Sequence, residues 1–412
     1  MTYIYPHERA KQEKRNEHAK TFHTNLTYIL TAKKQLSKQD ISGLEGKGMT
    51  IMQLPEDLLE RIFKDEYKDL LKTKLRDWIS YDKIDLKWLS ANINIEAINI
   101  LKKADPDNLD WKKLAANTSA YDILSAPENR ERLNKYKKEL SGNSDKDVVE
   151  FLQNNKDLVN LKILSGNKGA GEWLLTYENE LSSLDIKELL RNPGAINLIN
   201  KINDNPLLLL INWNFLSENP KAIKLLEQNR AKINWSSLSK NPNAIKLLSE
   251  KREEEKRLKQ DINTQRHYYN LNQYQKIDWG NLSSNPKAIE LLRDKIIEEN
   301  GLSPEEFAKL EKYEKINWDL LSANPKAIEL LRDKIIEENG LSPEEFAKLE
   351  KCEKINWDLL SANPGAIKLL KIYQEKINFK YLSMNPSIFA MDRWHTGSSP
   401  PPFAQKASSS PK

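Results

Sequence analysis

Apolar positions along the chain follow one short pattern that returns many times. In residues 316–331 a tryptophan is followed three residues later by a leucine, and a Ser-Ala-Asn-Pro segment then leads into Ala-Ile-Glu-Leu-Leu. Trp318 and Leu321 share one helical face, because side chains three residues apart are neighbours on a helix. The apolar residues of segment 327–331 form the stripe of a second amphipathic helix. The pattern therefore predicts a pair of short helices.

This helix pair occurs in eleven copies, most of them 22 to 27 residues apart, with steps of 39 residues around the two duplicated units and 44 residues after Trp235. Their anchor residues are Leu86, Trp111, Tyr136, Leu161, Ile186, Trp213, Trp235, Trp279, Trp318, Trp357 and Phe379. One pair of short helices cannot bury its own apolar faces, so the copies must stack. We predict an all-α fold, an elongated solenoid whose units can be removed singly.

Polar residues mark where each helix begins. Asn317 is a candidate N-cap of the first helix, because its side-chain oxygen can accept from an early backbone N–H. Ile316 and Leu321 stand at the positions of a hydrophobic staple. Asn324 is expected to cap the second helix, with Pro325 at its first position, where no N–H is needed. Aspartate takes the place of Asn317 in other copies, for example at Asp85, Asp110 and Asp278.

Two copies are expanded by a tandem duplication. Residues 287–325 and 326–364 agree at 38 of 39 positions and differ only where Cys352 replaces Tyr313. Their second helix is longer and meets a glycine at its end. A Ser-Pro-Glu-Glu capping box then begins a third helix at Ser342.

The remaining segments divide the chain into four parts. Residues 1–48 form a basic leader with nine Lys/Arg and five Asp/Glu, and residues 49–83 form a helical start module. Residues 84–391 hold the repeats, and the Ser/Pro-rich tail 392–412 is expected to be disordered. The charged segment 249–260 within the Trp235 copy is expected to form a solvated helix.

Composition narrows the class of protein. Hydrophobic residues make up 39% and charged residues 30% of the chain, and no run of about 18 apolar residues exists, so no membrane span is expected. Cys352 is the single cysteine, which favours a reducing compartment. The 13 glycines are too few for a turn-dense β fold.

Charge is distributed unevenly. Each duplicated unit has six basic and nine acidic residues, a net charge of −3. Because the two units contribute −6 to a total of +5, the other 334 residues carry +11. Such an excess could meet nucleic-acid phosphates, meet an acidic protein, or only keep the chain soluble.

The repeat resembles a known family. The pattern Trp-x-x-Leu-Ser-x-Asn-Pro-x-Ala-Ile-x-Leu-Leu is similar to the repeat of many proteins of giant DNA viruses, of the mimivirus and chlorella-virus kind, and it covers residues 84–391. The closing Leu-Ser-Met-Asn-Pro-Ser-Ile-Phe around Asn385 also resembles the end of such arrays. The resemblance implies a viral protein made in an infected eukaryotic cell. It implies no catalytic activity.

A second, shorter resemblance precedes the array. Residues 54–63, LPEDLLERIF, look like the opening of an F-box, whose helices dock a ubiquitin-ligase adaptor. Leu86 follows Leu54 by only 32 residues, which leaves little room for a full box. A helix that caps the array through Leu58, Leu59 and Ile62 is the preferred interpretation.

Candidate reactive groups have simpler explanations. The tryptophans could stack bases of a single-stranded nucleic acid, but their fixed place beside leucines favours a core role. Glu344 and Glu345 lie in a first helical turn, where carboxylates suit the helix dipole. Cys352 stands where the sister unit has Tyr313, so a nucleophile is not indicated. No metal-ligand spacing relates the histidines, which are His7, His18, His23, His267 and His395.

These observations predict a protein without catalytic, cofactor-binding or metal-binding residues; residues that bind a partner are not assigned. We expect a non-enzymatic protein-binding scaffold of a large DNA virus, a structural or minor capsid component located in the virion or the host cytoplasm. Its expected partners are capsid, other virion or host proteins, and nucleic acid is the less favoured alternative. The alternative is an F-box-like adaptor that recruits host targets to a ubiquitin ligase.

Overall fold

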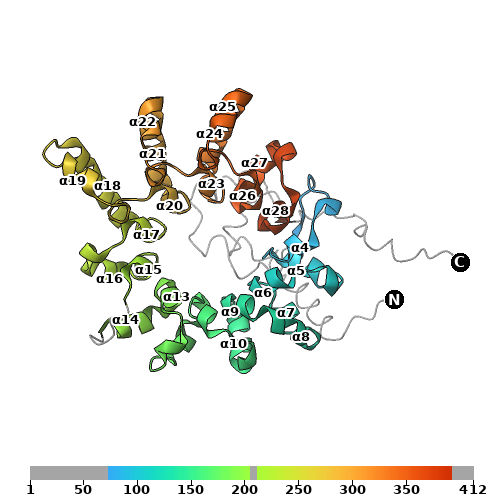
Figure 1. The fold of residues 1–412 in the computed structure, drawn as a ribbon. Helices are drawn as coiled ribbons and strands as arrows, with labels where there is room; N and C mark the ends of the chain where they lie inside the picture. Colours follow the sequence, from blue (N-terminus) through green and yellow to red (C-terminus); the bar gives the residue numbers. More distant parts are fainter. Residues whose placement is uncertain (1–72, 205–210, 392–412) are drawn as a thin grey trace, which may run out of the picture. The chain divides into compact units, whose positions relative to one another are not determined.

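A computed structural model describes residues 73–204 and 211–391, which belong to two compact units. One unit, Met1–Arg76 with Phe389–Lys412, includes strands β1 (Thr73–Leu75) and β2 (Phe389–Met391), which pair antiparallel with Leu75 opposite Phe389. The other, Asp77–Ile388, consists of short helices in succession (Figure 1). The predicted all-α repeat fold is confirmed. The leader 1–48, the F-box-like residues 54–63 and the tail 392–412 lie outside the described residues.

Each copy of the repeat begins with a short first helix at or next to its anchor residue. The third copy starts at Lys137, one residue after the anchor Tyr136. The first helices are α4 (Leu86–Leu89), α6 (Trp111–Ala116), α9 (Lys137–Gly142), α11 (Leu161–Leu164), α13 (Ile186–Arg191), α15 (Trp213–Ser217), α17 (Trp235–Leu238), α20 (Trp279–Ser283), α23 (Trp318–Leu321), α26 (Trp357–Ala362) and α28 (Phe379–Met384).

Second helices differ more in length, and some are followed by a third helix. The second helices are α5 (Ile95–Leu101), α7 (Tyr121–Leu124), α10 (Lys146–Asn154), α12 (Gly171–Leu175), α14 (Ile196–Asp204), α16 (Ile223–Gln228), α18 (Ile245–Gln260), α21 (Ile289–Asn300), α24 (Ile328–Asn339) and α27 (Ile367–Ile372). The additional helices are α8 (Arg130–Leu133), α19 (Gln265–Asn270), α22 (Pro304–Ala308) and α25 (Pro343–Lys348).

Single turns of 3-10 helix join these segments. They are η3 (Tyr81–Lys83), η4 (Pro106–Asn108), η5 (Pro127–Asn129), η6 (Asn134–Tyr136), η7 (Lys156–Leu158), η8 (Lys168–Ala170), η9 (Leu181–Ser183), η10 (Pro193–Ala195), η11 (Arg230–Lys232), η12 (Gln273–Gln275), η13 (Lys312–Glu314), η14 (Lys351–Glu353), η15 (Pro364–Ala366), η16 (Gln374–Lys376) and η17 (Pro386–Ile388).

The predicted caps of the first helices are confirmed. Asn317 Oδ1 accepts from the backbone N–H of Leu320 at 3.0 Å, and the aspartates at the same position accept equivalent bonds. Ser342 and Glu345 form the capping box in both directions. The predicted start of the second helix is wrong by three residues: α24 begins at Ile328 instead of Pro325. The Asn-Pro segment forms a separate turn before it, since Asn324 Oδ1 accepts from the N–H of Lys326 at 3.1 Å.

The asparagine of each Asn-Pro segment, or its equivalent, links its copy to the preceding one. Asn324 Nδ2 donates to the backbone oxygens of Ser283 and Asn285, both at 3.1 Å. Together with the bond from Lys326, this satisfies both amide hydrogens and the oxygen of a side chain that is only 2% exposed. The same bonds recur in all eleven copies, at Asn92, Asn117, Asn143, Asn167, Asn192, Asn219, Asn241, Asn285, Asn324, Asn363 and Asn385.

A serine two residues before this asparagine forms a second link in nine copies. Ser283 Oγ donates to Trp279 O within its own helix and accepts from the backbone N–H of Asn317, the cap of the next copy, at 3.0 Å. Ala115 and Leu190 replace the serine in the other two copies. The serines with this second bond are Ser90, Ser141, Ser165, Ser217, Ser239, Ser283, Ser322, Ser361 and Ser383.

These links also join the last copy to the first. Asn92 Nδ2 donates to the backbone oxygens of Ser383 and Asn385, each at 2.9 Å, and Asp85 N donates to Ser383 Oγ at 3.1 Å. The side chains of Trp88 and Tyr381 pack beside them, with ring centroids 4.8 Å apart. The expectation of an elongated array is therefore wrong: the series of hydrogen bonds within Asp77–Ile388 is closed.

The core follows the predicted apolar positions. The leucine three residues into each first helix has no exposed surface, from Leu89 to Leu382. Four tryptophans are buried: Trp111, Trp235, Trp279 and, at 9% exposure, Trp318. Trp213 and Trp357 are half-buried. The core role of the tryptophans is thus confirmed for the buried four. Burying each large side chain contributes about 1.5–3 kcal/mol to folding.

We predict that Asn324→Asp destabilises the repeats around it by roughly 3–5 kcal/mol. Aspartate has no hydrogen to donate, so the Ser283 and Asn285 oxygens lose their partner and face a buried negative charge. Hydrogen exchange around residues 279–331 measures the effect. Asn300→Asp is the matched control, because Asn300 is exposed at the end of α21. Equal exchange in both variants would contradict a stabilising role for the buried amide.

A second prediction concerns deletion of residues 326–364. The junction joins Pro325 to Gly365 and recreates the native sequence found at Pro364, so an open solenoid would only become shorter. In a closed series, the last copy must instead still bond to the first one although one copy is missing between them. We expect a helical variant that loses the bonds of Asn92, with fast hydrogen exchange in residues 86–101 and 379–388. Unchanged protection of both segments would contradict closure.

Candidate protein-interaction surface

Three neighbouring copies of the repeat carry longer second helices than the others. Helix α18 has 16 residues, and α21 and α24 have 12 each. Each is followed by a short third helix, and Figure 1 shows these helix pairs extending beyond the second helices of the other copies. We call them the expanded repeats; they span residues 235–275, 279–314 and 318–353.

A buried glutamate anchors each long helix to the next copy. Glu299 Oε1 accepts from the backbone N–H of Ile316 at 2.9 Å, and Glu338 Oε1 accepts from Ile355 at 2.8 Å. Glu255 does the same for Ile277 at 2.9 Å. These N–H groups immediately precede the cap of the following first helix, and without the carboxylate they would lie buried and unpaired.

A lysine four residues before each glutamate covers the tryptophan of its own copy. Nζ of Lys251 lies 5.3 Å from the ring centroid of Trp235, and the equivalent lysines lie at 5.4 Å and 5.2 Å from their rings. A cation at this distance is attracted by the ring face. The further pairs are Lys295 with Trp279 and Lys334 with Trp318.

Burial shifts the protonation of these groups. It raises the pKa of Glu255 from 4.5 to about 7, and it also raises the pKa values of Glu299 and Glu338. The pKa of Lys295 is lowered by burial, although Glu299 lies 3.7 Å away. The prediction that 249–260 is a solvated helix is therefore wrong in part, because Lys251, Arg252 and Glu255 are buried.

Ion pairs connect the three long helices to one another. Arg252 of α18 contacts Asp294 at 2.7 Å and Glu298 at 2.6 Å, both on α21. Arg293 of α21 lies 3.4 Å from Glu329 of α24. The Arg252 pairs join a side chain that is 7% exposed to partly exposed carboxylates, so solvent screens them less than a surface pair. Ion pairs therefore link each long helix to the next one.

Large apolar side chains are exposed on these repeats. Ile297 is 65% and Ile336 60% exposed, and both occupy the same position of the duplicated helix. Six such residues lie here, against five in the rest of the described chain. We call these six the apolar series: Ile262, Tyr269, Tyr274, Ile297, Ile336 and Phe346.

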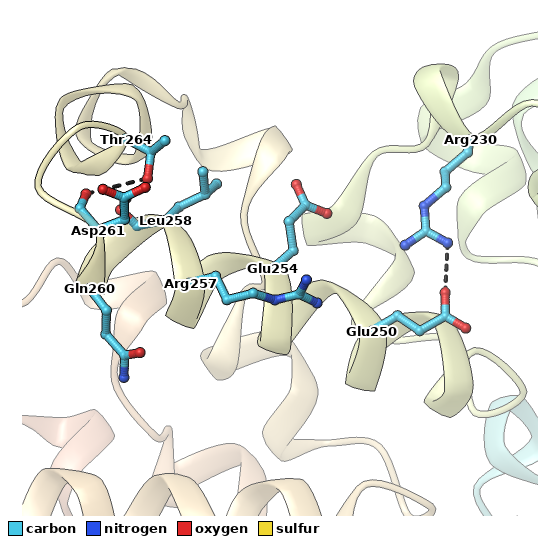
Figure 2. A pocket seen from close by; sticks show the side chains of 8 residues that line it. All are labelled: Arg230, Glu250, Glu254, Arg257, Leu258, Gln260, Asp261 and Thr264. Atoms are coloured by element: carbon cyan, nitrogen blue, oxygen red, sulfur yellow. Dashed lines mark hydrogen bonds and ion pairs between the residues drawn. The ribbon is translucent and has the colours of Figure 1, made fainter.

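An open cavity of about 880 Å³ lies along α18 (Figure 2). Arg230 pairs with Glu250 at 2.7 Å at one end, and this hydrogen bond lowers the pKa of Glu250. Figure 2 shows Asp261 and Thr264 at the other end. The cavity is lined by Arg230, Glu250, Glu254, Arg257, Leu258, Gln260, Asp261 and Thr264. Charges of both signs suit polar side chains of a partner rather than one small ion.

The sequence candidates for chemistry are not brought together. Within residues 73–204 and 211–391, no group of three or more His, Cys, Asp or Glu side chains could hold a metal ion. Cys352 is half-buried, and burial raises the pKa of its thiol, which disfavours the nucleophilic thiolate. His267 is exposed, and the other histidines lie outside the described residues. No helix in this part of the chain is long and apolar enough to cross a membrane.

The sequence analysis did not identify the buried lysine and the buried glutamate of each long helix. A signal was present: Lys-x-x-x-Glu stands at the same place in all three long helices, at residues 251–255, 295–299 and 334–338. In isolation such a pair is a common surface motif of a helix. Comparisons with protein-family models, with curated proteins and with solved structures found no match.

We predict that Glu255 makes the protein less stable as the pH rises from about 4.5 to about 7. The folded state keeps the Glu255 proton up to about pH 7, whereas the unfolded chain releases it near 4.5. Glu255→Gln retains an acceptor for Ile277 and should remove this part of the decline, seen as a flatter curve of melting temperature against pH. Glu253→Gln, at an exposed position, should follow the wild type. Parallel curves for wild type and Glu255→Gln would contradict the raised pKa.

Proposed function

We propose that this chain is a non-enzymatic protein-binding scaffold whose expanded repeats hold the partner. The apolar series is the observation that supports the proposal most, because six of the large exposed apolar side chains belong to the expanded repeats, and exposed apolar surface marks interaction sites. The ion pairs of Arg252 support it further, since a surface held in place loses less entropy on binding.

Charge indicates the chemistry of the partner. Each duplicated unit carries six basic and nine acidic residues. Exposed carboxylates such as Glu305 and Glu344 lie in the third helices, and Glu344 shares α25 with Phe346 of the apolar series. The partner is therefore a protein segment with apolar side chains flanked by basic ones. The likeness to giant-virus repeat proteins supports another virion protein in this role.

The alternative is an adaptor that recruits targets to a ubiquitin ligase through residues 54–63. It rests on the short F-box-like sequence alone. The expanded repeats would serve in it as the target-binding part, so the two proposals differ in the second partner. Ligase subunits that depend on residues 54–63 favour the adaptor, and abundant presence in purified particles favours the structural protein.

We predict that Ile297→Ser combined with Ile336→Ser weakens partner binding more than tenfold while the fold stays intact. Both side chains are already exposed, whereas truncating a central interface residue costs about 2 kcal/mol or more. Quantitative pulldown from infected cells with tagged protein identifies the partner, and titration of that purified partner gives the affinity. Ile93→Ser with Ile372→Ser is the control, since both residues are exposed outside the expanded repeats. Equal affinity of the two double variants would overturn the proposal.

A further inference from the structure

The type of residue at the second position of the first helix differs between two parts of the closed series. In six consecutive copies it is an exposed lysine, and the bonds of Asn92 make the last copy the neighbour of the first. We call these residues the lysine row: Lys380, Lys87, Lys112, Lys138, Lys162 and Lys187.

In four of the other five copies, the side chain at this position makes a hydrogen bond to the next copy. Asp319 Oδ1 accepts from Nδ2 of Asn356, the cap of the next copy, at 2.6 Å. Asp358 accepts from Asn378 at 2.8 Å in the same way. The four residues are Asn214, Ser236, Asp319 and Asp358, and the fifth copy has Gly280, which has no side chain to form the bond. A lysine side chain has no hydrogen-bond acceptor, so it cannot accept a bond from the cap of the next copy. This bond is therefore absent in six successive copies.

Attraction to neighbouring caps does not account for the lysine row. Lys380, Lys87 and Lys162 precede copies capped by aspartate, but Lys112, Lys138 and Lys187 precede copies with tyrosine or asparagine there. Among the described residues, ion pairs within 4.0 Å are recorded for one member, Lys112 with Glu139 at 3.7 Å, and its side chain is still 70% exposed.

Nearby carboxylates leave the row basic. The residue after each lysine in the helix is acidic in two copies, at Glu139 and Glu188, and Glu188 pairs with Arg191 at 3.0 Å. In the second copy it is Lys113, which pairs with the cap Asp110. The other neighbours are apolar or aromatic: Trp88, Ile163 and Tyr381. Exposed lysines therefore recur at one position of the repeat in six successive copies.

We propose that the lysine row binds the phosphate backbone of single-stranded nucleic acid. The residues beside the lysines differ from copy to copy, so no pocket for a peptide side chain repeats along the row. Only the positive charge repeats along the row. A polymer with a phosphate in every unit can pair with these charges in any register.

The geometry of the series favours a single strand over a duplex. Packed helices are spaced about 8–10 Å apart, so six lysines span roughly 45 Å. Because the series closes after eleven copies, the row turns through nearly half of the circuit over that length. A DNA duplex, with a persistence length of about 500 Å, cannot follow such a path, whereas a single strand bends freely.

The test is a fluorescence titration of the full chain with labelled oligothymidylate of about 20 nucleotides. Neutralising six phosphates predicts a slope of about −4 for the logarithm of the binding constant against the logarithm of the salt concentration. The triple variant Lys87→Gln, Lys138→Gln, Lys162→Gln should reduce the slope to about −2 and weaken binding at low salt at least about tenfold.

A matched triple variant, Lys309→Gln, Lys348→Gln, Lys368→Gln, removes the same charge from exposed positions outside the row and should bind as the wild type does. Because both variants retain the basic leader, only the row distinguishes them. Equal losses in the two variants, or no salt-dependent binding by the wild type, would overturn the proposal. Tighter binding of a duplex of about 20 base pairs than of the single strand would also overturn the proposal. Tighter binding of polyglutamate would overturn it in favour of an acidic protein.

Discussion

The buried asparagine side chain is the interaction on which the rest of this structure depends. Its amide has two hydrogens and one accepting oxygen, and in every copy all three are used: two bonds to the preceding repeat and one to its own turn. Glutamine is one methylene longer and aspartate has no hydrogen, so neither reproduces the set. A buried amide that lost these bonds would cost about 1–3 kcal/mol per group. The position of each repeat relative to its neighbour is therefore tightly restricted.

The same bonds tolerate large insertions elsewhere. Asn241 and Asn219 are 22 residues apart, whereas Asn285 and Asn241 are 44 apart, yet both pairs are joined in the same way. Extra residues go into the second helices and the helices that follow them. Length, charge and exposed apolar surface can thus vary from copy to copy without disturbing the closed series. The expanded repeats differ from the other copies in length and exposed apolar surface, and the copies of the lysine row differ from the others in charge.

The long helices need a further anchor, and buried charge provides it. Glu299 satisfies the backbone N–H of Ile316 while Lys295 lies against Trp279. Burying either charge alone would be strongly unfavourable, so the pair, the backbone N–H and the ring act together. Burial raises the pKa values of the three glutamates, although the backbone N–H and the lysine act in the opposite direction.

By itself, the sequence determined what depends on residues a few positions apart. The eleven copies, the caps at Asn317 and its equivalents, the capping box at Ser342 and the buried leucines all follow from local spacing. Only the tertiary structure decided the rest. Closure depends on the small rotation between copies, which adds up over eleven steps and has no local signature. Whether Glu255 is buried or Lys87 joins a row depends on which copy lies beside it, and the bonds of Asn92 and Asn385 across the chain decide that.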